Sequence, residues 1–264
     1  DFFNVIDTQE KAYFLGLLYS DGCNSTERNL IRIVLTNSDR EILERLSSII
    51  YIDYRPLEIR PEKTGIFRGK EYTTKESCVL AISSKKISKQ LEALGVVKAK
   101  TNKITFPSYL SDELISHFIR GYFDGDGSIS FTKKKQISMT ILGTDNFCQA
   151  LKRTVEEKLN INSTVCHAKK GSKTQQFVLH GNIVGKVFFD WLYKDATIYL
   201  QRKYDKYLEI KSKLPVHYYS CKICGKPNDT HGYCRKHYYE YIGKEKRRQR
   251  YLNFKKWFHF VIVG

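Results

Sequence analysis

Two segments of the chain, residues 14–22 and 119–127, repeat one pattern of apolar and polar positions. Each is an apolar stretch with small residues four apart, and each ends in Asp-Gly. Small residues at positions i and i+4 share one helix face, and a face without bulky side chains lets two helix backbones approach closely. We therefore predict two helices that pack on their small residues, which are Gly16 and Ser20 in the first and Gly121 and Gly125 in the second.

The pattern after each of these helices predicts the same succession of elements. In the first copy we expect strands at 29–36, 55–60 and 76–83 and helices at 38–50 and 84–94. In the second copy we expect strands at 128–131, 136–141, 163–168 and 174–180, a helix at 144–159 and further helices beyond Asn182. Ser38 is the expected N-cap of its helix, and Glu41 would complete a capping box.

The repeated succession indicates an internal duplication. The sequence thus predicts an α+β fold in which two pseudo-symmetric αββαββα repeats pack through their motif helices within one chain. We expect the first repeat at residues 1–106, the second at 107–213, and a small C-terminal module at 214–264. A polar connector at 98–107 joins the two repeats, so a monomer would contain both halves of the fold.

The duplication places two carboxylates, those of Asp21 and Asp126, at equivalent points of the two helices. An exposed aspartate in the last helical turn costs roughly 0.3–1 kcal/mol, because a helix C-terminus carries partial negative charge. Helix termination is an alternative explanation, since Gly22 and Gly127 suit the left-handed residue that ends many helices. If the helices cross, however, the two acids converge and repel each other unless a cation neutralises them. Hard oxygen ligands that face solvent suit magnesium, so we predict a shared divalent-metal site.

The composition fits a nucleic-acid partner without requiring one. Lys and Arg total 45 against 28 acids, a net charge of +17, which would equally suit a ribosomal or acidic-membrane partner. No apolar run reaches the roughly 18 residues of a membrane span and no signal peptide opens the sequence, so we expect an intracellular protein without a membrane partner. As expected for free thiols in a reducing compartment, no pairing pattern links Cys23, Cys78, Cys148 and Cys166.

The two motifs resemble those of the LAGLIDADG homing endonucleases, a family named for this nine-residue pattern. The first glycine and the last acid of the motif are matched by Gly16 and Asp21 in one copy and by Gly121 and Asp126 in the other. Tyr19 departs from the motif, which has an earlier acid at that position, whereas Asp124 keeps it. The resemblance covers residues 8–213.

The resemblance implies a monomeric enzyme that cuts both strands of a specific DNA site and leaves short 3′ overhangs. In the family the later acid of each motif holds catalytic magnesium, for which manganese or calcium can stand in. The corresponding metal residues here are Asp21, Asp126, Ser20 and Gly125. The best matches to the family's basic residues, which polarise water and phosphate at the edge of the site, are Lys100 and Lys203.

The resemblance also implies that two antiparallel sheets form a saddle over a double-stranded DNA target. A two-stranded ribbon fits the major groove, where Arg, Lys, Gln and Asn contact base edges. We expect this face to carry the cations beside the motif helices, namely Arg28, Arg32, Lys133, Lys134, Lys135, Lys169, Lys170 and Lys173. For any one of them a solvated hairpin tip is an equal alternative.

The last fifth of the chain contains a separate metal motif. The spacing Cys221-x2-Cys224-x9-Cys234-x2-His237 gives two knuckle pairs, as expected for tetrahedral zinc. His231 competes for the fourth position, but Cys-x2-His is the better geometry. A unit this small needs metal binding to fold, so we expect the zinc to be structural. The segment also resembles short zinc-binding modules of mobile-element and phage proteins.

Beyond the metal motif, seven cations meet one acid, Glu245, in the sixteen residues from Tyr241. We expect this tail to contact phosphates, with Arg247 and Arg248 as DNA-binding residues. Two other functions use the same scaffold, a catalytically silent DNA-binding regulator and an intron RNA maturase. The presence of both acids argues against the regulator, and the sequence leaves the maturase open. An intein is disfavoured, since no Cys or Ser opens the chain and no His-Asn closes it.

Overall fold

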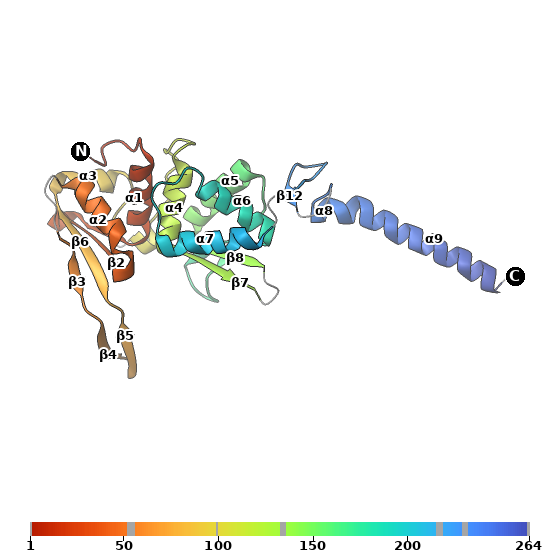
Figure 1. The fold of residues 1–264 in the computed structure, drawn as a ribbon, viewed down its shortest axis with the longest axis horizontal. Coiled ribbons are helices and arrows are strands. Elements are labelled where there is room, and N and C mark those ends of the chain that lie inside the picture. Colours follow the sequence, from red (N-terminus) through yellow and green to blue (C-terminus); the bar gives the residue numbers. More distant parts are fainter. Residues whose placement is uncertain are drawn as a thin grey trace.

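The computed structural model describes residues 2–51, 56–98, 100–132, 136–214, 219–228 and 232–262. Two α+β units lie side by side, and their helices α1 (Gln9–Ser20) and α4 (Ile115–Asp126) pack against each other where the units meet (Figure 1). A long helix, α9 (Gly243–Ile262), extends from the end of the molecule that the second unit occupies (Figure 1). Among the residues that the model describes, no helix is long and apolar enough to cross a membrane.

The first unit is an antiparallel sheet covered on one face by helices. Its strands are β1 (Gly22–Ser25), β2 (Leu30–Thr36), β3 (Glu58–Arg60) and β6 (Ser77–Ser83), in the spatial order β1-β2-β6-β3. The covering helices are α2 (Arg40–Ile50) and α3 (Lys85–Ala93). Short 3-10 turns are η1 (Thr26–Arg28), η2 (Asn37–Asp39) and η3 (Lys100–Asn102). A hairpin of β4 (Lys63–Phe67) and β5 (Lys70–Thr74) projects from this unit (Figure 1).

The second unit repeats this sheet strand for strand. Its strands are β7 (Gly127–Phe131), β8 (Ile137–Gly143), β9 (Thr164–His167) and β10 (Gln175–His180), in the order β7-β8-β10-β9. Its helices after α4 are α5 (Asp145–Leu159), α6 (Asn182–Leu192) and α7 (Gln201–Lys213). The repetition confirms the predicted α+β fold with two antiparallel sheets. The predicted domain boundaries at 106 and 213 stay predictions.

Alternation along the central strands gives each sheet one buried face. In β2, Ile31, Ile33 and Leu35 are buried while Arg32 between them is exposed. In β8 the buried set is Ile137, Met139 and Ile141. The inward side chains of both sheets join those of α1 and α4 in one hydrophobic core. Among the described residues, no helix covers the opposite face of either sheet (Figure 1).

The predicted N-cap of α2 is wrong. Ser38 lies in the 3-10 turn η2, where its hydroxyl contacts the Thr36 hydroxyl at 3.0 Å, and α2 begins two residues later at Arg40. The side chain of Asp39 points away from the helix and pairs with Arg202 of α7 at 2.9 Å. A contact between the two units therefore prevails over the local capping box.

The hairpin β4–β5 was not predicted, because the strands of an exposed ribbon show no buried alternation. Its turn is formed by Arg68 with φ of 51° and Gly69 with φ of 74°. Two successive residues with positive φ match the right-handed twist of the flanking strands, which makes this a favoured hairpin connection. The second unit has only a short loop, residues 168–174, in the corresponding place.

The C-terminal module is built from short elements. Strand β11 (Tyr219–Ser220) pairs with β12 (Pro227–Asn228), and the chain continues through α8 (Arg235–His237) and the π-helical turn η4 (Tyr238–Ile242) into α9. These helical segments follow one another directly, so the base of α9 is tied to α8.

Candidate functional site

The crossing of α1 and α4 depends on glycine at two positions. A Cβ atom added to Gly16 would lie 2.1 Å from the carbonyl oxygen of Phe118, and one added to Gly121 would lie 1.9 Å from that of Tyr13. Both distances are far shorter than a van der Waals contact, and each clash is with the backbone of the other helix. The small-residue face that the sequence predicted is therefore a helix–helix interface.

The crossing brings the two motif acids together. Asp21 is the C-cap of α1 and Asp126 is the last residue of α4. A Cβ atom on Gly125, beside Asp126, would lie 2.2 Å from Oδ2 of Asp21 and 2.0 Å from Oγ of Ser20. The Ser20 hydroxyl donates to the Leu17 carbonyl at 3.0 Å and to Asp21 Oδ2 at 3.2 Å, so it helps to fix the Asp21 carboxylate.

The electrostatics of this pair favour a bound cation. Burial raises the pKa of Asp21, and the Ser20 hydroxyl and the ammonium groups of Lys100 and Lys203 oppose that rise. Burial and then the negative charge of Asp21 raise the pKa of Asp126, and the same lysines oppose them. Two half-buried carboxylates, of which Asp21 disfavours the ionisation of Asp126, are a donor set that fits a hard divalent cation.

The glycines that follow these acids do not end the helices in the left-handed conformation. Gly127 has φ of −88°, and Gly22 is not among the residues with positive φ. Glycine is needed there for space, because a Cβ atom would lie 2.6 Å from the Leu18 carbonyl oxygen at Gly22 and 2.1 Å from Phe123 Cδ2 at Gly127. Simple helix termination therefore does not explain the two Asp-Gly pairs.

Lys100 and Lys203 occupy equivalent places in the two units. The Lys100 ammonium donates to the carbonyls of Leu18, at 2.6 Å, and Gly22 at the end of α1. The Lys203 ammonium donates to the carbonyls of Phe123 and Gly127, the latter at 2.8 Å, at the end of α4. Leu18 and Phe123 each lie three residues before a motif acid. The lysines thus neutralise the negative ends of the two motif helices.

Burial lowers the pKa of both lysines to about 8, although nearby aspartates pull it upward. A cavity of about 280 Å³ beside the crossing is lined by Lys100 of the first unit and Asp126 of the second, together with Ser20, Tyr122 and Thr174. Groups from both units therefore converge on one space, where a phosphate or a water molecule would meet a carboxylate and an ammonium group.

A buried polar network beneath this site joins the units and was missed by the sequence reasoning. Asp124 Oδ2 accepts hydrogen bonds from the Tyr13 hydroxyl of α1 at 2.7 Å and from the Leu200 backbone N–H at 2.8 Å. Arg120 donates to the carbonyls of Ile198 and Leu192, both at 2.8 Å. The available signal was a pair of charged residues inside an otherwise apolar motif helix.

Of the predicted DNA-contacting cations that are described, Arg28 lies in η1, Arg32 in β2, and the remaining three in the loop between β9 and β10. Arg28, Arg32, Lys169, Lys170 and Lys173 are exposed, and Arg28 and Arg32 line a groove of about 290 Å³ with Lys98. Lys133, Lys134 and Lys135 lie outside the described residues. Uncharged polar side chains, which the sequence analysis did not single out, lie on the helix-free face of the second sheet. The alternation of positions along its strands indicates them: Ser128, Ser130, Ser138, Thr140, Gln176 and His180.

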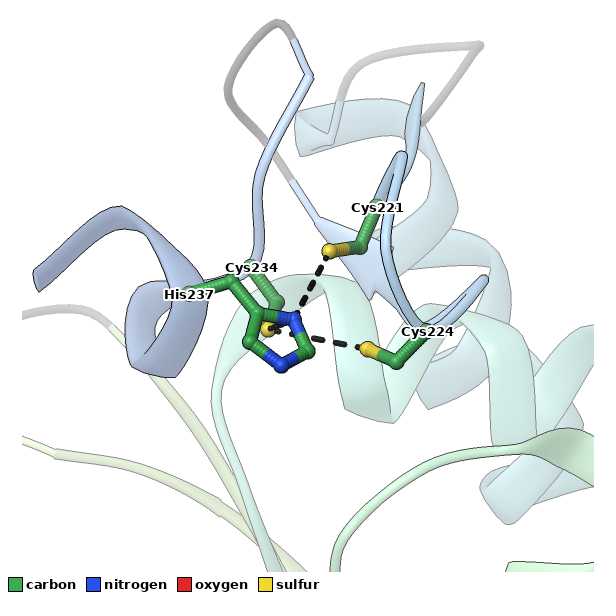
Figure 2. Close-up of side chains that lie close together, drawn as sticks. All are labelled: Cys221, Cys224, Cys234 and His237. Carbon is green, nitrogen blue, oxygen red and sulfur yellow. Dashed lines mark hydrogen bonds between the residues drawn. The ribbon is translucent and has the colours of Figure 1, made fainter. Parts of the chain in front are cut away.

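The C-terminal module contains a second site, which Figure 2 shows from close by. The ligand atoms of Cys221, Cys224, Cys234 and His237 all lie within 4.8 Å of one another. The Cys224 and Cys234 sulfurs are 3.8 Å apart, and His237 Nδ1 lies 3.2 Å from Cys221 Sγ and 3.5 Å from Cys234 Sγ. A tetrahedral zinc ion with bonds of about 2.3 Å to sulfur and 2.0 Å to nitrogen requires ligand separations of about 3.5–3.8 Å.

Groups around these four side chains support metal binding. Burial raises the pKa of the Cys221 thiol, but the backbone N–H groups of Cys234, Cys224 and Ile223 outweigh it and bring the pKa to about 5. The outer nitrogen of His237, Nε2, lies 4.0 Å from Oε2 of Glu240. Zinc-bound histidines commonly donate this N–H to a carboxylate, and 4.0 Å is longer than such a hydrogen bond. His231, the competing ligand, lies outside the described residues.

Part of the chain matches a known family model. Residues 113–196 match the family model of the LAGLIDADG-like domain. Among solved structures, the chain is similar to I-SmaMI bound to an uncleaved DNA target, with 12% identity, a TM-score of 0.47, and 76% of this chain and 89% of that chain covered. It is also similar to the N-terminal LAGLIDADG domain of DUF199/WhiA, with 16% identity, a TM-score of 0.44, and 77% and 91% covered.

Two curated proteins match over parts of the chain. The probable translation initiation factor IF-2 of Methanocaldococcus jannaschii is 28% identical over 66% of this chain, and a component of the A-type ATP synthase of Methanopyrus kandleri is 26% identical over 46%. The matched regions span 14% of the first protein and 10% of the second. A match to so small a part carries neither protein's activity to this chain. Residues 113–196 thus match the LAGLIDADG-like domain, and with its two motif helices the chain resembles the LAGLIDADG homing endonucleases.

Proposed function

We propose that the protein is a site-specific DNA endonuclease of the homing type, which hydrolyses one phosphodiester bond in each strand and leaves short 3′ overhangs. The observation that carries this proposal is the convergence of Asp21 and Asp126 at the helix crossing, each flanked by a lysine in an equivalent place. Because one chain supplies both acids, a monomer is sufficient to cut both strands. We also propose that the chain is divided into two repeats, which follow from the duplication, and a C-terminal module.

Magnesium is the proposed catalytic cofactor, with Asp21 and Asp126 as its ligands and Ser20 and Gly125 beside them. When bound, a divalent ion neutralises charge at the scissile phosphate and stabilises the leaving 3′ oxygen. The chain's own groups do the rest. Ser20 orients the Asp21 carboxylate, and Lys100 and Lys203 are held at the helix ends, where their charge attracts a phosphate and polarises its oxygens.

The proposed DNA surface is the helix-free face of both sheets. Exposed cations at the strand ends would position the phosphates, and polar side chains on the sheet, such as Arg32, Thr140 and Gln176, would reach base edges. The twist of the two sheets suits a curved surface along a duplex. Binding to DNA also gives the net charge of +17 a physical role.

The proposal is tested by replacing each motif acid. We expect Asp21→Asn and Asp126→Asn each to lower double-strand cleavage by at least about a hundredfold, while affinity for the same duplex stays within about tenfold, because the acids hold metal and repel phosphate. The substrate is a duplex selected for cleavage from a random library in the presence of magnesium. Asp205→Asn, which changes an exposed acid on α7, is the matched control and should cut normally.

Each other result has a definite meaning. Full cutting by either motif variant would refute the assignment of the acids. Specific duplex binding by the unmodified protein without any cleavage would indicate a DNA-binding regulator. Binding of a structured intron RNA in preference to every duplex would indicate a maturase.

We also propose that Cys221, Cys224, Cys234 and His237 bind one structural zinc ion. Support comes from ligand separations of 3.2, 3.5 and 3.8 Å, which are close to those of a tetrahedral site. With all four positions filled by protein groups, this site has no open position for catalysis. Its metal would therefore contribute to folding of the module.

A further inference from the structure

The metal module is attached to the outer end of the second unit through residues next to the metal ligands. The side-chain amide of Asn160 donates to the carbonyl of Cys224 at 2.8 Å, and the Lys226 ammonium donates to the side-chain oxygen of Asn162. Asn160 and Asn162 follow α5, whose last turn ends at Asn160 with φ of 50°. The module is therefore attached to the second unit in part through Cys224, one of the proposed metal ligands.

The seam between module and unit is loosely packed. A cavity of about 300 Å³ lies along it, lined by Ile161 and Ile183 of the second unit and by Pro227 and Cys234 of the module. Apolar burial across the seam is therefore incomplete, and hydrogen bonds at defined backbone positions carry more of the attachment. Metal binding would hold those positions, because it fixes both knuckles of the module.

The same ligand set also fixes the start of α9. His237 ends α8, the backbone N–H of Tyr238 donates to the carbonyl of Cys234 at 2.8 Å, and η4 leads directly into α9. Glu240 of η4 faces His237. The direction of α9 relative to the second unit is thus set by the metal ligands.

The sequence of α9 indicates a polyanionic partner. The helix carries seven cations and one acid, which is six of the chain's seventeen net positive charges, and residues 244–253 are all exposed. The i, i+4 pairs Lys244/Arg248 and Lys246/Arg250 repel each other and cost about 0.2–0.5 kcal/mol each. A row of phosphates would remove this repulsion. The helix is about 30 Å long, close to one turn of duplex DNA.

We propose that the zinc-bound module is a rigid connector. It holds α9 along duplex DNA, beyond the part of the target that the second unit contacts. Zinc binding then lengthens the DNA footprint on one side only. This inference rests on the proposed DNA-binding function and adds to it a metal-dependent phosphate contact. The helix leaves the molecule on the side of the second unit and points away from both units (Figure 1).

The experiment uses the full-length Asp21→Asn/Asp126→Asn protein and a selected target duplex. The duplex either ends at the recognised sequence or continues for about one helical turn at one end or the other. We expect the extension of the duplex at one end to raise the affinity about tenfold. Arg247→Ala/Arg248→Ala should abolish this gain in affinity. Cys224→Ser should abolish it too. Lys85→Ala/Lys89→Ala, a matched pair of exposed cations on α3, should keep it.

A second variant separates attachment from metal binding. Asn160→Gly preserves the left-handed backbone and removes the amide that holds Cys224, so it should lose the gain while its zinc content is unchanged. The proposal would be overturned if Cys224→Ser kept the gain in affinity. It would also be overturned if neither extension of the duplex raised the affinity. Tighter binding of an RNA stem than of duplex DNA through the same arginines would assign α9 to RNA.

A failure of this inference is distinguishable from a failure of the endonuclease proposal. If no sequence is cut, the variants are compared on a duplex of random sequence about four helical turns long. Arg247→Ala/Arg248→Ala should then lower the slope of log affinity against log salt by up to about two, one for each lost phosphate contact. An unchanged slope overturns the role of α9 whatever the outcome for cleavage.

Discussion

Asp124 and Tyr19 occupy the same position of the two motifs and do different things. Asp124 is completely buried and reaches across the crossing to the Tyr13 hydroxyl, whereas Tyr19 donates to the Leu94 carbonyl in its own unit. Burial raises the pKa of Asp124 to about 6, although the Leu200 N–H, Lys203 and Tyr13 oppose the rise. The earlier acid of the second motif is therefore a structural link between the units.

The raised pKa of Asp124 predicts a pH dependence of stability. A carboxyl group whose pKa is higher in the folded state binds more protons there, so its contribution to the free energy of unfolding falls as pH rises from about 4 toward and past 6. Asp124→Asn keeps an acceptor for Tyr13 and Leu200 but cannot ionise. Between about pH 5 and pH 7 the unmodified protein should lose about 1 kcal/mol more stability than this variant.

Urea unfolding at a series of pH values measures this difference. Asp205→Asn, at an exposed site on α7, serves as the control and should follow the unmodified protein. Parallel pH curves for Asp124→Asn and the unmodified protein would show that Asp124 titrates normally in the folded state.

At the scale of elements, α1 and α4 organise both the fold and the site. Their close approach requires glycine at the crossing, and their C-terminal ends place Asp21 and Asp126 side by side. Lys100 and Lys203 bind the carbonyls of those ends. A positive charge at a helix C-terminus is stabilising, so each lysine offsets part of the unfavourable position of its neighbouring aspartate.

The crossing is tested by Gly121→Ala. The added methyl group would lie 1.9 Å from the Tyr13 carbonyl oxygen, so the helices must separate. We expect a loss of about 2–3 kcal/mol in the free energy of unfolding and slower cleavage, because the two acids move apart. Denaturant unfolding and a cleavage assay on one sample give both numbers.

Gly243→Ala is the matched control for this substitution. It adds the same methyl group to the first residue of α9, where the nearest atom is a flexible side-chain carbon of Tyr239 at 3.3 Å. Stability there should change by less than about 1 kcal/mol, in the favourable direction. Equal stability of the two variants would mean that the small-residue face is not a tight interface.

At the scale of the whole molecule, the two ends are different although the centre is duplicated. The hairpin β4–β5 extends the first unit, and the metal module with α9 extends the second (Figure 1). The hairpin forms a two-stranded sheet of its own and exposes Ile66 and Phe67 at its tip. The duplicated sheets thus supply a symmetric central surface, and each end adds its own extension.

The proposed zinc site predicts one zinc ion per purified chain. Cys224→Ser should lower the zinc content to a small fraction of that value, and Cys166→Ser, at an exposed thiol in β9, should not change it. Since the four ligands lie outside the two sheets, removal of zinc should leave the thermal transition of the duplicated core within a few degrees. Elemental analysis and calorimetry test the two parts separately, and zinc-free purified protein would refute the site.

The sequence by itself determined the features that depend on neighbouring residues. The alternation of Ile31, Ile33 and Leu35 predicted a strand, the four-residue spacing of small residues predicted the crossing face, and Cys-x2-Cys with Cys-x2-His predicted a cluster that the fold brings together. Each of these patterns involves residues that are close together in the sequence, so the element that it predicts does not depend on the rest of the fold. The duplication was equally visible, because each copy repeats its own local signals.

Only the tertiary structure decided which distant side chains meet. The family resemblance singled out Lys100 and Lys203 among 45 cations, but only the fold places their ammonium groups on matching carbonyls at the ends of α1 and α4. The bonds from Tyr13 to Asp124 and from Asp39 to Arg202 join residues more than a hundred positions apart, and the second of these overrode a correctly spaced capping box. Such pairings depend on how closely two helices pack and on how two units are oriented, and no local pattern encodes either quantity.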